Sequence, residues 1–173
     1  RRPPRSTLDR SSAASDVYKR QGPYDPRERN FLCSCGAPLL VRYDLDKAKT
    51  WSKSSLSNRD PNMWRYEELM PLLDTEKPIT LGEGFTPLIH ARTLGNDLGL
   101  KSLYIKDESL NPTNSFKARG LSAAVTRAYH LGAKTLSVPS AGNAANAMAA
   151  YAARANITAK VFMPKDVKLP FIR

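Results

Sequence analysis

A lysine at position 117 follows a run of turn-forming and helix-capping residues, Asn-Pro-Thr-Asn-Ser-Phe, at 111–116. The hydroxyl of Thr113 or Ser115 can accept hydrogen bonds from the free N–H groups of a helix that begins here. Lys117 then lies in the first helical turn, where the helix dipole favours a neutral amine over a cation. A neutral amine is the form in which lysine reacts as a nucleophile. A solvated surface lysine is the simpler alternative for this position taken alone.

A second polar turn, Ser140-Ala141-Gly142-Asn143, precedes an alanine-rich segment. Backbone N–H groups at the start of a helix form a ready site for an anion such as a carboxylate. The side-chain amide of Asn143 can donate a further hydrogen bond to a ligand. An ordinary capped turn remains the alternative for this segment taken alone.

The apolar patterns around the two turns predict regular elements that position them. The expected order is strand, helix, strand, helix, strand, at residues 103–105, 115–131, 134–138, 144–155 and 158–163. Because each crossover is a helix, we expect an α/β fold with parallel strands, a βαβαβ open sheet, whose last strand is buried. Ligands in such sheets lie beyond the carboxyl ends of the strands. The loops at 107–117 and 139–143 both follow such ends.

The chain divides into three expected regions. Residues 1–21 are rich in Arg, Ser and Pro, and we expect no packed structure there. They fit a transit peptide, a disordered tail or, as the run at 16–21 suggests, a translated sequencing adaptor. Residues 22–78 are an N-terminal extension with a cysteine knuckle and a linker. Residues 79–173 contain both polar turns and are expected to be part of a candidate catalytic domain that stops inside a connection, as in a fragment.

The knuckle contains the only two cysteines, Cys33 and Cys35, so a disulfide framework is excluded. Two cysteines and a glycine resemble half of a zinc ribbon, which needs four ligands. Neither His90 nor His130 is placed to complete such a site. We therefore expect no metal in this chain, and two buried or free thiols are the alternative.

Composition limits the classes of partner. The chain is 41% hydrophobic and 25% charged, as in ordinary globular domains, and has no apolar run long enough to span a membrane. Its net charge of +11 is scattered, and residues 1–21 alone account for +4. We therefore expect no nucleic-acid partner. Reduced cysteines fit the cytoplasm.

Four segments together resemble threonine synthase, a family within the tryptophan-synthase-β-like enzymes that depend on pyridoxal phosphate. They are C-x-C-G-x-P-L-x-V-x-Y-D at 33–44, E-G-F-T-P-L at 83–88, K-D-E-S-L-N-P-T-N-S-F-K-A-R-G at 106–120 and P-S-A-G-N-A-A-N-A at 139–147. The resemblance implies a fold of that group and an amino-acid substrate, O-phospho-L-homoserine, converted with water to L-threonine and phosphate. It also implies a homo-oligomeric parent protein.

The resemblance implies a role for each candidate residue. Lys117 is the Schiff-base lysine and moves protons during catalysis, and Asn143 bonds the 3′-oxygen of the cofactor. The turn formed by Ser140, Ala141, Gly142 and Asn143 holds the substrate carboxylate. Thr86 is a weaker candidate contact at the mouth of the active site. The resemblance places the ligands of the cofactor's phosphate and pyridine nitrogen beyond residue 173, so we expect the chain by itself to lack activity.

The sequence departs from the family pattern at several of these positions. Asn114 replaces the usual Gly before Ser-Phe-Lys, and Ala118 replaces the usual Asp after the lysine. Ala141 and Ala144 replace two threonines of the second turn. Threonine/serine dehydratase and cysteine synthase therefore remain alternatives within the cofactor class. A small basic binding module with a zinc knuckle is the alternative outside the enzymes.

Overall fold

The computed structural model describes residues 13–15, 24–73 and 75–167. The chain forms two compact units, each built from separate stretches. The first contains residues 1–60, 64–78 and 126–133, and the second contains residues 61–63, 79–125 and 134–173. The candidate residues Thr86, Lys117 and 140–143 all belong to the second unit.

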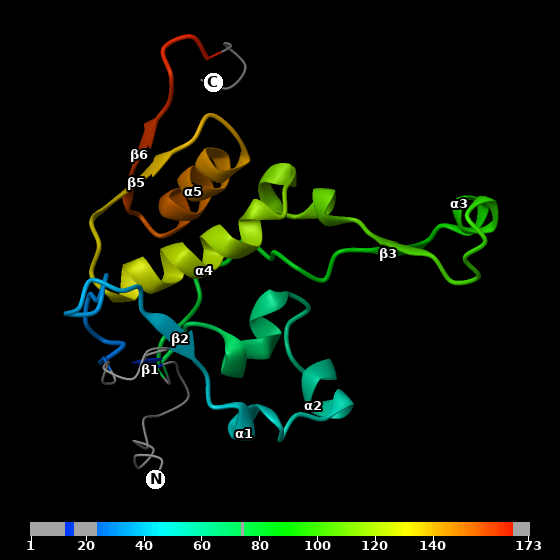
Figure 1. Cartoon of the computed structure of the whole chain (residues 1–173), viewed down its shortest axis with the longest axis horizontal. Helices are drawn as coiled ribbons and strands as arrows, with labels where there is room; N and C mark the ends of the chain where they lie inside the picture. Colours follow the sequence, from blue (N-terminus) through cyan, green and yellow to red (C-terminus); the bar gives the residue numbers. More distant parts are fainter. Residues whose placement is uncertain (1–12, 16–23, 74, 168–173) are drawn as a thin grey trace. The chain divides into compact units, whose positions relative to one another are not determined.

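Three elements of the second unit agree best with the predicted fold. They are β5 (Thr135–Pro139), α5 (Asn143–Arg154) and β6 (Thr158–Phe162). β5 and β6 pair in parallel, with Thr135 opposite Thr158 and Pro139 opposite Phe162. Figure 1 shows α5 crossing between these strands. This confirms one parallel βαβ unit of the α/β fold. The expected burial of the last strand is wrong, because Phe162 is 61% exposed and α5 covers only one face of the pair.

The first predicted strand is present as β4 (Tyr104–Lys106), but its partner differs from the expectation. β4 pairs antiparallel with β3 (Leu88–His90), in a two-stranded sheet separate from β5 and β6. The prediction of a single βαβαβ sheet is therefore wrong for the described residues. The connection from β3 to β4, residues 91–103, carries α3 (Arg92–Asp97). Figure 1 shows α3 at the tip of this ribbon.

Helix α4 (Lys117–His130) matches the predicted helix and begins at the candidate lysine. Gly132, with φ of +75°, follows its last turn in the left-handed conformation that glycine tolerates. Before the helix come two short 3-10 turns, η2 (Glu108–Leu110) and η3 (Pro112–Asn114). The lysine loop is thus a chain of tight turns that ends in a helix.

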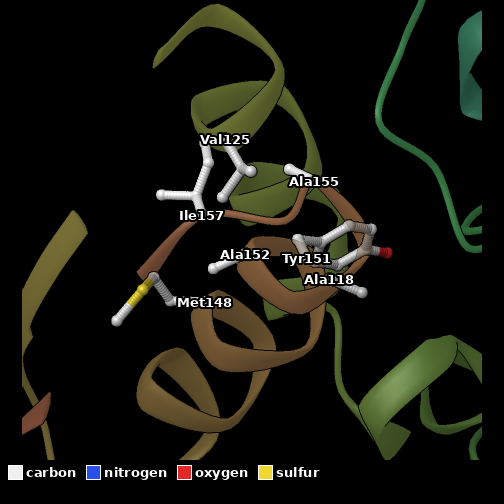
Figure 2. Close-up of a cluster of buried hydrophobic side chains, with 7 residues drawn as sticks. All are labelled: Ala118, Val125, Met148, Tyr151, Ala152, Ala155 and Ile157. Atoms are coloured by element: carbon white, nitrogen blue, oxygen red, sulfur yellow. The ribbon is translucent and has the colours of Figure 1, made fainter. Parts of the chain in front are cut away.

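A cluster of buried apolar side chains from α4, α5 and the turn between α5 and β6 forms the core of the second unit. Its members are Ala118, Val125, Met148, Tyr151, Ala152, Ala155 and Ile157. Small alanines on α5 let the chain pack closely, as the alanine-rich pattern predicts. Figure 2 shows the hydroxyl oxygen of Tyr151 pointing away from the other labelled side chains. The helices that carry Lys117 and Asn143 therefore share one core.

The first unit contains β1 (Ala13–Ser15), β2 (Leu40–Arg42), α1 (Leu45–Ala48), α2 (Lys53–Ser57) and the 3-10 segment η1 (Met63–Leu69), whose Met63 belongs to the second unit. β1 pairs antiparallel with β2, so the expectation of an unstructured tail is wrong for residues 13–15. Backbone pairing on an exposed strand edge needs no apolar side chains, which explains why composition missed it. The rest of the predicted tail lies outside the described residues.

Residues 33–36 form a tight turn in which the Gly36 N–H donates to the Cys33 carbonyl oxygen at 2.8 Å. The Cys35 N–H donates to the Cys33 sulfur at 3.4 Å, and both cysteines are free thiols. Among the described residues, no three His, Cys, Asp or Glu side chains gather where they could hold a metal ion. The expectation that this chain holds no metal therefore stays a prediction.

Candidate active site

The candidate lysine is presented at the first residue of α4. The Lys117 N–H donates to Ser115 Oγ at 3.1 Å, so of the two predicted capping residues Ser115 holds the start of the helix. The Lys117 side chain is exposed, and its Nζ lies 4.8 Å from the centre of the Phe116 ring. The amine is therefore accessible to a ligand while its backbone is fixed.

A carboxylate clamps the two ends of the lysine loop together. Glu108, in η2, accepts hydrogen bonds from Arg119, in the first turn of α4, at 2.6 Å from Nε and 2.8 Å from Nη2. Such a two-point ion pair fixes orientation as well as distance. The bonds from Arg119 hold the pKa of Glu108 down at about 2 despite its partial burial. Glu108 is therefore ionised, and the segment around Lys117 is closed into a loop.

Thr86 meets the lysine loop through the same carboxylate. Its side chain is buried, and its hydroxyl donates to Glu108 Oε1 at 2.6 Å. Lys106 also donates from its amine to the Thr86 carbonyl oxygen. The structure therefore brings this candidate residue to the lysine loop, where its hydroxyl oxygen bonds to a protein carboxylate.

Asn111 ties the same loop to the Glu83–Pro87 segment. Its side-chain amide donates to Glu108 Oε2 at 2.9 Å, and its Oδ1 accepts from the Gly84 N–H at 3.0 Å. Gly84 has φ of +97°, and a Cβ there would lie 2.6 Å from the Met63 nitrogen, so only glycine fits. The E-G-F-T-P-L motif thus has a physical role in supporting the lysine loop.

The backbone between Asn111 and Ser115 is unusual. Thr113 and Asn114 both adopt left-handed conformations, with φ of 61° and 52°. Asparagine tolerates this conformation better than other residues with a side chain. Asn114 therefore keeps the backbone geometry that the family's glycine would allow, which accounts for one of the departures noted in the sequence.

The second turn is anchored by its backbone and is otherwise open. The Ser140 N–H donates to the Phe162 carbonyl oxygen at 3.0 Å, and the Gly142 N–H donates to Ser140 Oγ at 3.2 Å. Within the described residues, no side chain caps the first turn of α5, and a Cβ built on Gly142 would meet no atom within 4 Å. Asn143 is exposed. Free N–H groups at the start of a helix of this length suit an anion.

The two motifs meet where η3 packs against α5. In the same turn, the Thr113 hydroxyl is buried and has no hydrogen-bond partner within the part of the chain that the structure describes. A buried hydroxyl without a partner costs about 1–3 kcal/mol. The open start of α5, the accessible Lys117 amine and this unpaired hydroxyl therefore fit a bound group that carries both an aldehyde and hydrogen-bonding oxygens.

Sequence reasoning selected the candidate reactive groups and missed the residues that hold them in place. Glu108, Arg119 and Asn111 all lie within the quoted lysine motif but received no role. An acidic and a basic residue at the two ends of one loop were the available signal, since such pairs close loops. Nothing in the sequence alone assigned Asn111 to two partners at once.

Comparison with known proteins identifies the family. The family described as "Pyridoxal-phosphate dependent enzyme" matches residues 79–173. The chain is 41% identical over 143 residues to threonine synthase from Methanocaldococcus jannaschii, covering 82% of this chain and 35% of that protein. It is 39% identical over 142 residues to threonine synthase from Methanosarcina acetivorans, covering 82% of this chain and 34% of that protein. The chain thus spans about a third of the length of these curated relatives.

Proposed function

Because this chain belongs to the pyridoxal-phosphate dependent enzymes, we propose that Lys117 is the residue that holds the cofactor and that the parent activity is threonine synthase. The reaction would convert O-phospho-L-homoserine and water to L-threonine and phosphate, in a lyase of amino-acid biosynthesis. One observation carries the assignment to Lys117. The Lys117 side chain is exposed at the first residue of α4, and the loop before it is clamped by Glu108 and packs against α5.

The described residues divide the work of binding and proton transfer. Lys117 would hold the cofactor covalently through Nζ and, when displaced by the substrate amine, would carry protons between neighbouring carbons. Asn143 would donate to the cofactor's 3′-oxygen. The N–H groups of the turn at 140–143 would hold the substrate carboxylate, which a helix start favours. Bound pyridoxal phosphate supplies the electron sink for carbanions.

Thr86 has a narrower part in this proposal. Its hydroxyl already donates to Glu108, so it can only accept a hydrogen bond from a ligand. A substrate amine or hydroxyl would be a suitable donor. We assign it to the substrate side of the site for this reason, with a hydroxyl or N–H group of the substrate as the donor.

The proposal extends to the setting of the parent protein. Among the described residues, no helix is long and apolar enough to cross a membrane. Cysteines that form no disulfide fit an enzyme of the cytoplasm. We further propose that the parent protein is a homo-oligomer that acts on a small amino acid and has no nucleic-acid partner. Size measurement and localisation of the parent protein test these points.

Reductive trapping tests the role of Lys117. The chain is mixed with pyridoxal phosphate, reduced with borohydride and mapped by peptide mass spectrometry. We expect the label to concentrate on Lys117, and Lys117→Arg to remove it. Lys101→Arg, a change at an exposed lysine on the β3–β4 ribbon, is the matched control and should leave the label in place. Labelling spread evenly over the surface lysines would contradict the assignment.

Exchange of segments tests the substrate. The aligned segment of the Methanocaldococcus jannaschii enzyme is replaced by the corresponding 143 residues of this chain. We expect the hybrid to release phosphate from O-phospho-L-homoserine, and its Lys117→Arg variant to release none. Deamination of serine or threonine without phosphate release would instead favour a dehydratase.

A further inference from the structure

A buried carboxylate, outside the residues assigned above, lies between the two helices that carry the candidate site. Glu83 is 0% exposed. Ser122 of α4 donates from its hydroxyl to Glu83 Oε1, and Tyr151 of α5 donates to Oε2 at 2.6 Å. Two donors from its own loop, the Thr80 hydroxyl at 3.1 Å and the Leu81 N–H at 3.0 Å, also reach Oε2. One side chain thus bonds both helices.

The charge state of this group follows from its donors. Burial opposes ionisation of Glu83, but the hydrogen bonds from Ser122, Tyr151 and the Leu81 N–H outweigh it and lower the pKa of the carboxyl. Burial and the bond to Glu83 raise the pKa of Tyr151 above its usual value, so its hydroxyl keeps the proton it donates. A buried carboxylate held by charge-assisted bonds resists displacement, because each donor lost leaves the charge less compensated.

On each helix, the residue that bonds Glu83 lies at a fixed distance from the first residue of that helix. Ser122 lies five residues after Lys117, about 7.5 Å along the helix axis at 1.5 Å per residue. Tyr151 lies eight residues after Asn143, about 12 Å along its helix. Because a helix segment of this length is stiff, joining the two points fixes the separation of the two helix starts.

The segment that contains Glu83 also reaches the lysine loop. The next residue, Gly84, donates its N–H to Asn111 Oδ1, and Asn111 in turn bonds Glu108. The apolar cluster beside Tyr151 packs the helices together but does not set their register, since contacts between alanines are non-directional. Hydrogen bonds are directional and therefore supply the register that the apolar contacts lack.

We propose that Glu83 is a positioning residue that joins α4 to α5 and thereby sets the placement of Lys117 relative to Asn143. This inference rests on the proposed function, because the placement of Lys117 relative to Asn143 affects activity only if both residues bind the cofactor. Glu83 acts through Ser122 and Tyr151 and does not touch the reacting atoms. Loosening one helix from Glu83 should therefore disturb the start of the other.

Hydrogen–deuterium exchange of the full chain tests the coupling without any cofactor. The variant is Tyr151→Phe, which keeps the packing of the ring and removes one bond to Glu83. We expect amide exchange in the first turn of α4 to rise at least threefold, although the change is on α5. Tyr129→Phe removes the hydroxyl of an exposed tyrosine on α4 and should change neither helix start. An effect of Tyr151→Phe confined to α5, or absent, overturns the proposal.

Trapping of pyridoxal phosphate on Lys117 provides the second readout. We expect Tyr151→Phe and Glu83→Gln to slow trapping at least fivefold per folded molecule, the folded fraction being measured by circular dichroism. Normal trapping in folded Tyr151→Phe overturns the proposal, and this variant decides the matter if Glu83→Gln does not fold. Failure of the unsubstituted chain to take label on Lys117 contradicts the proposed function, while the exchange measurement still decides the coupling between the helices.

Discussion

The lysine loop and the Ser140–Asn143 turn are built in opposite ways. The lysine loop is held by side chains, with Glu108 accepting from Arg119, Thr86 and Asn111. The second turn is held mainly by its own backbone and by Ser140, and no side chain caps the helix that follows it. In the first region, side chains bond the polar groups that close the loop, although the Thr113 hydroxyl has no partner among the described residues, whereas the second region keeps N–H groups available at the start of α5.

This difference matches the two tasks in the proposed function. A residue that forms a covalent bond to a cofactor benefits from a fixed backbone, because position is then determined before the ligand arrives. A turn that binds an anion must leave its donors free until the anion comes. The contrast predicts that substitutions in the lysine loop cost mainly stability, whereas those in the second turn mainly change binding.

The largest effect is expected at Glu108. Glu108→Gln weakens the bonds from Arg119 and leaves a guanidinium without its full partner. We expect the free energy of unfolding to fall by about 2 kcal/mol, since bonds to charged groups contribute more than neutral ones. Urea unfolding followed by circular dichroism measures this. Glu28→Gln, a change at an exposed glutamate, should alter the value by less than about 0.5 kcal/mol. Equal effects would show that the clamp contributes no stability.

The same clamp should weaken in acid. The pKa of Glu108 is lowered to about 2 from an ordinary value of 4.5, chiefly by the hydrogen bonds from Arg119. A carboxyl with a lowered folded-state pKa stabilises the fold fully above its unfolded value and loses that contribution as pH falls through the folded value. The difference in melting temperature between the unsubstituted chain and Glu108→Gln should therefore be constant above about pH 5 and shrink towards pH 2. A difference that does not change across this range would contradict the ionised clamp.

A smaller loss of stability is expected at Asn114, which has φ of 52°. Asn114→Ala should lower the free energy of unfolding by about 1 kcal/mol, because alanine resists the left-handed conformation. Asn114→Gly should stay within about 0.5 kcal/mol of the unsubstituted chain, since glycine accepts it. Asn146→Ala, the same change within right-handed α5, is the control and should not destabilise. Equal losses from Asn114→Ala and Asn114→Gly would point to the amide group instead of the backbone.

Periodicity predicted α4 and α5 well, missed α3 and predicted the sheet poorly. The apolar spacing at 115–131 and the small residues at 144–155 are local signals, and α4 and α5 appear where they indicate. The partner of β4 depends on a strand that lies earlier in the chain, and a three-residue strand such as β3 carries too little pattern to reveal its partner. Pairing is a long-range property that local spacing does not contain.

The site shows the same division. Capping residues and helix starts leave a local signature, which marked Lys117, Ser115 and the turn at 140–143 as candidates, and the family resemblance gave Lys117 and the turn their expected roles. The hydrogen bonds of Glu83 could not be predicted from local signals. Its partners Ser122 and Tyr151 are distant from it in the sequence, and the residues beside them form no recognisable motif. Buried polar hydrogen bonds depend on the tertiary packing. The sequence therefore indicated the candidate reactive groups but not the residues that hold them in place.

The smallest change in stability is expected in the second turn, at Gly142, where a Cβ meets nothing within 4 Å. Gly142→Ser supplies a capping hydroxyl that can accept from the free N–H groups of α5, and should raise the free energy of unfolding by a few tenths of a kcal/mol. The same hydroxyl competes with an anion, so the affinity for the carboxylate of L-threonine, measured by NMR titration, should fall several-fold. Gly142→Ala adds a Cβ without a hydroxyl and should lower stability instead, because alanine caps helices poorly. A gain in stability without loss of carboxylate binding would show that the anion does not use these N–H groups, and the contrast between the two regions would then fail at this turn.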